Sequence, residues 1–301
     1  MGQMKIFNMN TPEIPSPGNF IFTANKFLKG FEYNGFDVLE INSLNNLEQY
    51  NNESNYIFLS NHFTNNDIIY NIAKILPKCN FICFHLNFNK ELRGNMPLSR
   101  YIITGEYYQT NPISSSEHLD AHNFNLSCKN WLPLTFSSSA DPNMIGKLQR
   151  QDIYHSMFVG SSYKKDWTTR LQNCFFNFDS SGFISETDRI NAFLNSRVCL
   201  GFHSDANIIN GCVTERVFEG LSYGCIVVTD NIYATKMTNG IVKYVTSFDE
   251  LESIIHKANT DNNFFYETQS QGYEFARKEG LYFHQAQKFI AKMKELYESN
   301  I

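Results

Sequence analysis

The sequence has 301 residues, of which 42% are hydrophobic and 18% charged, and its formal net charge at pH 7 is −5. This length suffices for two cores of about 100–150 residues each, and the composition excludes an intrinsically disordered chain. The acidic balance argues against a strongly basic binding surface, so nucleic acid is not expected as a partner.

Several further classes of protein are excluded by simple patterns. No apolar run approaches the roughly 20 residues that a membrane-spanning helix needs, so we expect no transmembrane segment. The seven cysteines are odd in number and lie mostly in apolar runs, which is typical of reduced core cysteines in a cytoplasmic protein. Neither a CxxC pair nor an HExxH array is present, and we therefore expect no metal site and no cofactor.

Short apolar strands alternate with helical stretches in the first part of the chain. The spacing predicts, in order, a strand at 5–10, a helix at 20–35, strands at 36–41 and 56–60, a helix at 67–76, and strands at 81–85, 101–103 and 131–136. Strands that alternate with helices of about ten residues indicate a parallel, doubly wound sheet. A small, polar, proline-containing segment at 137–142 then marks a boundary.

A second series of the same kind follows the boundary. It comprises a strand at 156–159, a polar helix that ends at 171, a strand at 174–178, a helix at 186–194, a strand at 198–202, a helix at 215–223, a strand at 225–229 and a helical stretch at 264–297 that Gly272 and Gly280 interrupt.

These elements predict an α/β fold with two Rossmann-like, doubly wound domains that face a central cleft. The domains span 1–142 and 152–275, and a C-terminal helix at 276–301 packs back towards the first domain.

The most informative stretch lies between the predicted strands at 198–202 and 225–229. A polar, glycine-containing loop leads to Thr214, which is placed to cap a helix whose free N–H groups suit a phosphate. Glu215 and Glu219 are four residues apart and share one face of that helix, where a carboxylate can accept both hydroxyls of a ribose. Arg216 lies in the first turn, where it can pair with a diphosphate.

This helix carries a recognisable run of residues. It resembles the segment ER-x-FE-x-L-x-x-G of GT-B glycosyltransferases, in particular small bacterial and viral ones, through Glu215-Arg216-Val217-Phe218-Glu219-Gly220-Leu221-Ser222-Tyr223-Gly224. The resemblance extends over 151–245. It implies that Glu219 contacts the donor ribose, that the base is read near Ile184, and that the loop before the helix covers the diphosphate. The loop residues assigned to the donor are His203, Gly211, Val213 and Thr214.

One position departs from the family pattern. Many retaining members carry a second Glu eight residues before the ribose-binding one, and Gly211 stands there in this chain. The retaining subgroup therefore does not follow from the resemblance.

A second element suited to phosphate follows the strand at 156–159. Gly160 and Ser161 permit close approach of the backbone, and Lys164 and Arg170 can neutralise a diphosphate without a metal. A turn glycine and solvated cations are also common without any such role, and this alternative stays open.

In the first domain, several polar residues lie near the carboxyl ends of predicted strands. Glu13, His62 and Asp67 are candidate bases for deprotonating an acceptor hydroxyl, and the sequence does not single out one of them. Gly18 and His85 are assigned to the acceptor side of the cleft.

We therefore expect a metal-independent glycosyltransferase that moves a sugar from a nucleoside diphosphate sugar to a hydroxyl of a glycan or glycolipid. A nucleotide-sugar epimerase or hydrolase on the same scaffold is an alternative, as is a non-catalytic nucleotide-sugar-binding protein. A dehydrogenase fits less well, since no GxGxxG follows the first strand.

Overall fold

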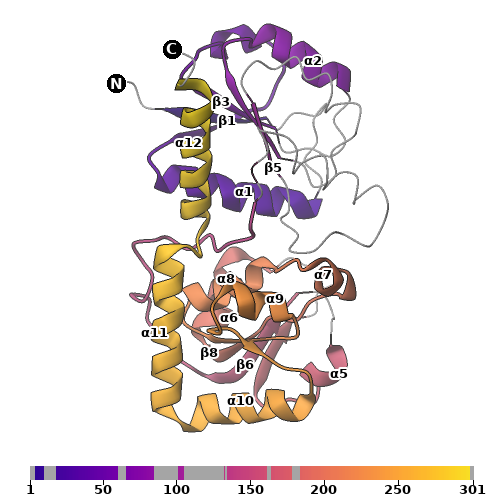
Figure 1. The fold of residues 1–301 in the computed structure, drawn as a ribbon, viewed down its shortest axis with the longest axis vertical. Helices are drawn as coiled ribbons and strands as arrows, with labels where there is room; N and C mark the ends of the chain where they lie inside the picture. The colour runs from indigo at the N-terminus through magenta and orange to yellow at the C-terminus, as the bar shows by residue number, and fades with distance from the viewer. Residues whose placement is uncertain are drawn as a thin grey trace. The chain divides into compact units, whose positions relative to one another are not determined.

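The computed structural model describes residues 4–9, 18–59, 66–84, 101–104, 132, 134–160, 164–177 and 184–298. These residues form two compact units, which are drawn in Figure 1. The first unit contains the described residues up to Thr135 together with 282–298, and the second contains 136–281.

The first unit is built on a five-stranded parallel sheet in the order β2-β1-β3-β4-β5. Its strands are β1 (Lys5–Met9), β2 (Asp37–Ile41), β3 (Asn55–Leu59), β4 (Asn80–Phe84) and β5 (Tyr101–Thr104). Its helices are α1 (Gly18–Tyr33), α2 (Asn66–Ile75) and α12 (Tyr282–Glu298), with a short 3₁₀ helix, η1 (Leu47–Tyr50). The predicted doubly wound parallel sheet is confirmed.

Alternation along the inner strand β1 explains why helices are needed on both faces of this sheet. Phe7 and Met9 lie in the core that includes residues of α2, whereas Ile6 lies in the core that includes α1 and α12. Gly30 lets the last helix approach α1 closely, because a Cβ there would lie 2.3 Å from the carbonyl oxygen of Tyr282. The helix α12 is thus part of the core of the first unit.

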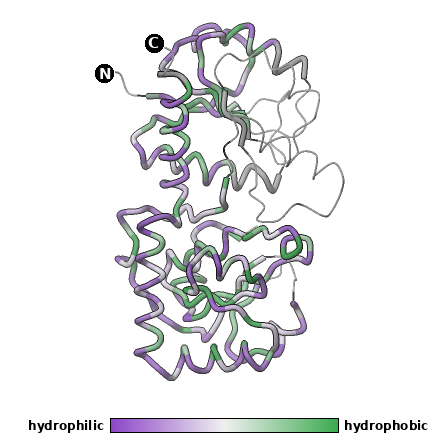
Figure 2. The backbone as a smooth tube through the Cα atoms, in the orientation of Figure 1, coloured by the Kyte–Doolittle hydropathy of each residue, from purple (hydrophilic) through white to green (hydrophobic). Residues whose placement is uncertain are grey.

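The second unit repeats the same winding with the strand order β10-β9-β8-β6-β7, again all parallel. Its strands are β6 (Tyr154–Val159), β7 (Cys174–Asn177), β8 (Ser196–Leu200), β9 (Ile226–Thr229) and β10 (Lys243–Tyr244). Its helices are α5 (Lys165–Thr168), α6 (Glu186–Leu194), α7 (Asp205–Asn210), α8 (Glu215–Ser222), α9 (Ile232–Met237), α10 (Phe248–Thr260) and α11 (Asn262–Lys278). Figure 2 shows hydrophilic and hydrophobic residues alternating along α10 and α11, as expected of helices with one side against a core.

The division between the units falls between Thr135 and Phe136, directly before the segment at 137–142 in which the sequence indicates a boundary. The backbone N–H of Ser138 donates to the carbonyl of Gly280 over 2.9 Å, and the Arg277 guanidinium donates to the carbonyl of Ile145 over 3.0 Å. These contacts attach the segment 136–150 to the second unit. The strand predicted at 131–136 does not form in its described residues, 132 and 134–136.

The predicted C-terminal helix at 276–301 is also corrected. The helix α11 continues to Lys278, and α12 begins at Tyr282, so the break falls at Gly280. Gly272 does not interrupt α11; a Cβ there would lie 3.2 Å from a Leu221 methyl carbon, so the glycine allows close packing on α8. None of the helices that the structure describes is long and apolar enough to cross a membrane.

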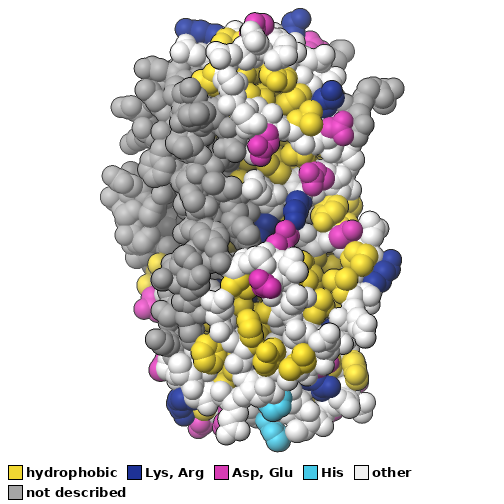
Figure 3. All heavy atoms as spheres, turned by 180° about the vertical axis from the view of Figure 1, so that it is seen from behind, with side chains coloured by type: hydrophobic (Ala, Val, Ile, Leu, Met, Phe, Trp, Pro, Cys, Tyr) yellow, Lys and Arg dark blue, Asp and Glu magenta, His cyan; other side chains and the backbone are white. Residues whose placement is uncertain are grey.

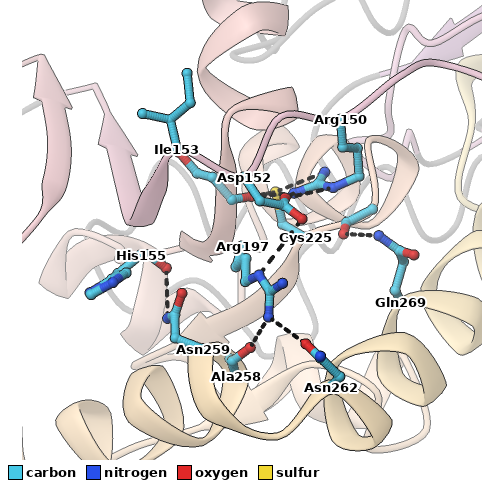
Figure 4. A network of polar contacts seen from close by, with 12 residues as sticks. Arg150, Asp152, Ile153, His155, Arg197, Cys225, Ala258, Asn259, Asn262 and Gln269 are labelled. Atoms are coloured by element: carbon cyan, nitrogen blue, oxygen red, sulfur yellow. Dashed lines mark hydrogen bonds and ion pairs between the residues drawn. The ribbon is translucent and has the colours of Figure 1, made fainter.

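A network of hydrogen bonds and ion pairs lies at the amino ends of the strands in the second sheet (Figure 4). The guanidinium of Arg150 donates to the carbonyls of Phe193, Ser196 and Tyr223 and to the carboxylate of Asp152. Phe193 and Tyr223 lie at the C-terminal ends of α6 and α8. A cation is favourable there, because the last carbonyls of a helix lack partners within the helix.

Arg197 extends this network towards the outer helices. Its Nε lies 3.6 Å from the second oxygen of Asp152, and its Nη1 donates to the carbonyl of Ala258 and to the side chain of Asn262. The network therefore ties the amino ends of β6 and β8 to α10 and α11.

Candidate functional site

The winding of the second sheet reverses between the neighbouring strands β6 and β8. The chain leaves β6 towards the edge strand β7 and leaves β8 towards β9. In open parallel sheets, ligands bind outside the carboxyl ends of the strands at such a switch point. Gly160 follows β6, and Gly201, Phe202 and His203 follow β8, so these residues lie where a ligand is expected.

Gly160 and Arg216 meet at this point. The backbone of Gly160 has φ 138°, which a side chain rarely adopts, and a Cβ there would lie 2.1 Å from Nη2 of Arg216. The guanidinium also donates to the carbonyl of Phe202 over 3.2 Å, and its carbon lies 4.5 Å from the centre of the Phe158 ring. The glycine thus makes room for a half-buried cation between the carboxyl ends of β6 and β8.

The first turn of α8, which carries Arg216, begins at Thr214. The Thr214 side chain makes no capping hydrogen bond to this turn, although its backbone has the extended conformation of an N-cap. Its own N–H donates instead to Nε2 of His203 over 3.2 Å. The start of α8 is therefore a helix N-terminus of the kind that receives anions.

His203 is buried between this helix start and the end of β9. Its Nδ1 lies 3.4 Å from Oδ1 of Asp230, and its backbone N–H donates to the same oxygen over 3.0 Å. Burial lowers the pKa of His203 below its ordinary value; Asp230 opposes this shift and Arg216 adds to it. The imidazole is consequently neutral at physiological pH.

Glu219 lies one turn further along α8 and forms a buried ion pair with Arg189 of α6. Although burial works to lower the pKa of the guanidinium, Glu219 raises it above its ordinary value. The guanidinium of Arg189 therefore stays charged. Glu215, four residues earlier, is half-buried at the start of the helix.

The other two predicted cations lie against aromatic rings. The exposed Lys164 has its Nζ 4.9 Å from the centre of the Trp167 ring, and the exposed Arg170 stacks on the Phe248 ring of α10 at 3.6 Å. Arg170 therefore lies against α10 in this structure, and of the two arginines assigned to the diphosphate it is Arg216 that lies at the switch point.

Ile184 lies in a different setting. It lines a groove of about 320 Å³ between α6 and strands β6 and β7, together with Phe175 and Asn177 of β7. This volume is at the lower end of those that hold small ligands. Gly211 ends α7 in the left-handed conformation, with φ 66°, and Val213 is buried beside it.

The comparison with protein families decides the class of the molecule. Residues 142–291, about half of the chain and nearly all of the second unit, match the family described as "Glycosyl transferase-like". The chain is a glycosyltransferase. No curated protein matches its sequence.

The glycosyltransferase also has the fold of a solved relative. An alpha-glucosyltransferase in complex with UDP and a 13-mer DNA containing a central A:G mismatch matches it with a TM-score of 0.58 and 11% sequence identity. The match covers 98% of this chain and all of the other. At this identity the likeness concerns the fold.

Some predicted site residues of the glycosyltransferase lie outside the described residues, namely Glu13, His62, His85 and Ser161. Gly18 opens α1, and Asp67 belongs to α2. Among the residues that the structure does describe, no three His, Cys, Asp or Glu side chains gather where they could hold a metal ion.

Two residues of the site were missed by sequence reasoning. Asp230, the partner of His203, directly follows β9, and its position at the carboxyl end of a parallel strand was the available signal. Arg189, the partner of Glu219, lies 30 residues away in the sequence on a different helix, and no local pattern marks it.

Proposed function

We propose that this glycosyltransferase moves a sugar from a nucleoside diphosphate sugar to a hydroxyl of a glycan or glycolipid. One observation carries the proposal: the guanidinium of Arg216 lies at the switch point of the second sheet, in a space that Gly160 leaves for it, at the start of α8. A cation beside a helix N-terminus is suited to a diphosphate.

The chemistry follows from this placement. When the bond between the sugar carbon and the terminal phosphate oxygen breaks, both electrons go to the oxygen and the diphosphate leaves with an additional negative charge. Arg216 and the first N–H groups of α8 would stabilise that charge as it develops. Fixed positive groups can replace a metal in this role, so we propose a metal-independent reaction.

The remaining roles are proposed on the family resemblance. Glu219 would accept the ribose hydroxyls, and its pairing with Arg189 supports this because the guanidinium donates to one carboxylate oxygen and fixes the position of the other. Ile184, His203, Gly211, Val213, Thr214 and Glu215 would complete the donor site, with Ser161, Lys164 and Arg170 nearby in sequence. Gly18 and His85 would lie on the acceptor side, and the base would be His62, Glu13 or Asp67.

The acceptor is the least constrained part of the proposal. The structural relative binds DNA, whereas this chain carries a net charge of −5. On the face shown in Figure 3, the Lys and Arg side chains of the described residues are scattered among acidic ones. This distribution favours a glycan over the polyanionic backbone of DNA, which would need a basic surface.

A transfer assay tests the function directly. UDP-, GDP-, ADP- and CMP-linked sugars would be incubated with the protein alone, with oligosaccharides, with glycolipids, and with duplex DNA that carries a hydroxyl-bearing base, in the presence of EDTA. We expect release of nucleotide only with one sugar donor and a glycan or glycolipid. Release without any acceptor would indicate a hydrolase, transfer to DNA would overturn the acceptor, and no release with tight donor binding would indicate a non-catalytic binding protein.

A further inference from the structure

The side chain of His203 is fully buried, and its ring has a partner at each nitrogen. A backbone N–H can only donate, so Nε2, 3.2 Å from the nitrogen of Thr214, must be the acceptor. The ring proton must then reside on Nδ1, which faces Oδ1 of Asp230 at 3.4 Å. The geometry thus requires the neutral, Nδ1-protonated imidazole.

This ring links three elements at the carboxyl end of the sheet. His203 follows β8, Asp230 follows β9, and Thr214 begins α8. A second bond of the same kind lies beside it, since the Asn231 side chain donates to the carbonyl of Cys212 over 2.8 Å. The loop before α8 is therefore held to the ends of two strands, and the helix start is held by the imidazole.

The contact with Thr214 matters because this residue directly precedes the proposed diphosphate site. The next two residues, Glu215 and Arg216, supply the first backbone N–H groups of α8 and the guanidinium of that site. Since the Thr214 side chain forms no cap, the histidine takes over the anchoring of this turn. A change at Nε2 would reorient the groups that meet the anion.

We propose that His203 is a positioning residue, oriented by Asp230, which holds the start of α8 in the orientation that binds the donor diphosphate and releases it when the imidazole is protonated. This inference rests on the proposed function. A proton on Nε2 cannot bond to the N–H of Thr214, because both are donors. It would bond instead to the hydroxyl oxygen of Thr214, which lies 3.4 Å from Nε2, and the backbone N–H would lose its acceptor.

The direction of the pH dependence follows from the groups around the ring. Asp230 faces it from the end of β9 and Arg216 from α8, while the neighbouring Thr214 and Thr229 are neutral. Burial, the largest influence, lowers the pKa of His203 in the folded protein. The contact is therefore intact above the ordinary histidine pKa and is lost as the pH falls below that value through the lowered one.

Three variants separate anchoring from packing. His203→Gln retains an acceptor near the position of Nε2 but cannot be protonated there, and His203→Leu removes the acceptor. His256→Gln alters an exposed histidine of α10 and serves as the control. Amide exchange at Thr214, measured by NMR without nucleotide, reports whether the hydrogen bond from its N–H to residue 203 is present. Titration with UDP, or with whichever nucleoside diphosphate binds best, reports how the loss of that hydrogen bond changes nucleotide affinity.

At about pH 7.5, we expect His203→Leu to exchange the Thr214 amide about tenfold faster than the wild type and to bind the nucleotide about tenfold more weakly, the size of one lost hydrogen bond. His203→Gln should stay within about threefold of the wild type on both measures. Between about pH 7 and pH 5, the affinity of the wild type should fall more steeply than that of His203→Gln, which supplies the baseline for titration of the phosphate itself. His256→Gln should follow the wild type.

The inference is overturned if His203→Leu leaves the Thr214 amide as slow as in the wild type, or if His203→Gln is as impaired as His203→Leu. If the nucleotide affinities of the wild type and His203→Gln fall equally with pH, protonation of His203 does not release the start of α8. If the wild type binds no nucleoside diphosphate, the proposed function fails, and amide exchange still decides whether His203 anchors the helix. If His203→Leu does not fold, the comparison of the wild type with His203→Gln decides.

Discussion

Arginines lie at both ends of the second sheet, and their contacts differ between the two ends. At the amino ends of the strands, Arg150 has a side chain that is 9% exposed and is bonded to three carbonyls and to Asp152. At the carboxyl ends, Arg216 is half-buried, bonded to the carbonyl of Phe202 and seated against Gly160.

The same helices account for this difference. The helices α6 and α8 place their C-terminal carbonyls at the amino end of the sheet, where Arg150 donates to the carbonyls of Phe193 and Tyr223. Arg197 likewise donates to the carbonyl of Ala258 in α10. The start of α8 lies at the carboxyl end, and Thr214 does not cap it with its side chain. One end of the sheet is therefore saturated with internal partners and serves stability, and the other presents positive groups to a ligand.

The largest expected effect is on stability, at the amino end. Arg150→Met should reduce the free energy of unfolding by about 3–5 kcal/mol, because it leaves the carbonyls of Phe193, Ser196 and Tyr223 without their donor and removes one of the two cations beside Asp152. Urea denaturation measures this, with Lys278→Met on the exposed face of α11 as a control that should not move the midpoint. Nucleotide affinity of the folded fraction should be unchanged; a variant as stable as the wild type would contradict the structural role of the network.

The next effect concerns the buried pair at the carboxyl end. Glu219→Gln and Arg189→Met should each cost about 3 kcal/mol of stability, because each leaves one buried charge without its counter-ion. The double variant Glu219→Leu/Arg189→Met should regain much of this, since an apolar pair can replace a buried ion pair. Nucleotide affinity should not recover with stability. If it does, Glu219 acts only in folding and does not bind the ribose.

Gly160→Ala tests whether the space beside Gly160 is needed for the guanidinium of Arg216. It should cost about 1–3 kcal/mol of stability through backbone strain and should also weaken nucleotide binding, because its Cβ displaces Arg216. Gly240→Ala is the matched control, since Gly240 also has positive φ but a Cβ there meets nothing within 4 Å. Gly240→Ala should lower the stability and leave nucleotide affinity unchanged. Equal nucleotide affinities of the two variants would show that the displacement of Arg216 is unimportant.

The smallest effect is expected at Arg170. The structure stacks this side chain on Phe248, so Arg170→Met should change nucleotide affinity by less than about threefold. Isothermal titration calorimetry measures this. A loss as large as that of an Arg216 variant would show that Arg170 leaves the ring to meet the diphosphate.

The comparison also explains what sequence reasoning could reach. Periodicity predicted nearly all strands of both sheets, and the run from Glu215 to Gly224 located α8. The helices α7 and α9 were missed because helices of six residues leave little periodic signal. The helix α10 was missed although Leu251, Ile255 and Ala258 recur at helical spacing. The partners of Glu219 and His203 were missed for another reason: Arg189 and Asp230 reach them through tertiary packing, which spacing along the chain does not reveal.

The central claim is that the carboxyl ends of β6 and β8 bind a nucleoside diphosphate through Arg216. Calorimetric titration of UDP, GDP, ADP and CDP into the wild type and Arg216→Met, with Arg170→Met beside them, tests it most directly. We predict that one nucleotide binds the wild type and that Arg216→Met binds it about 10–100-fold more weakly while its unfolding midpoint stays close to that of the wild type. Equal binding by the wild type and Arg216→Met, or no binding of any nucleotide to the folded wild type, would contradict the claim.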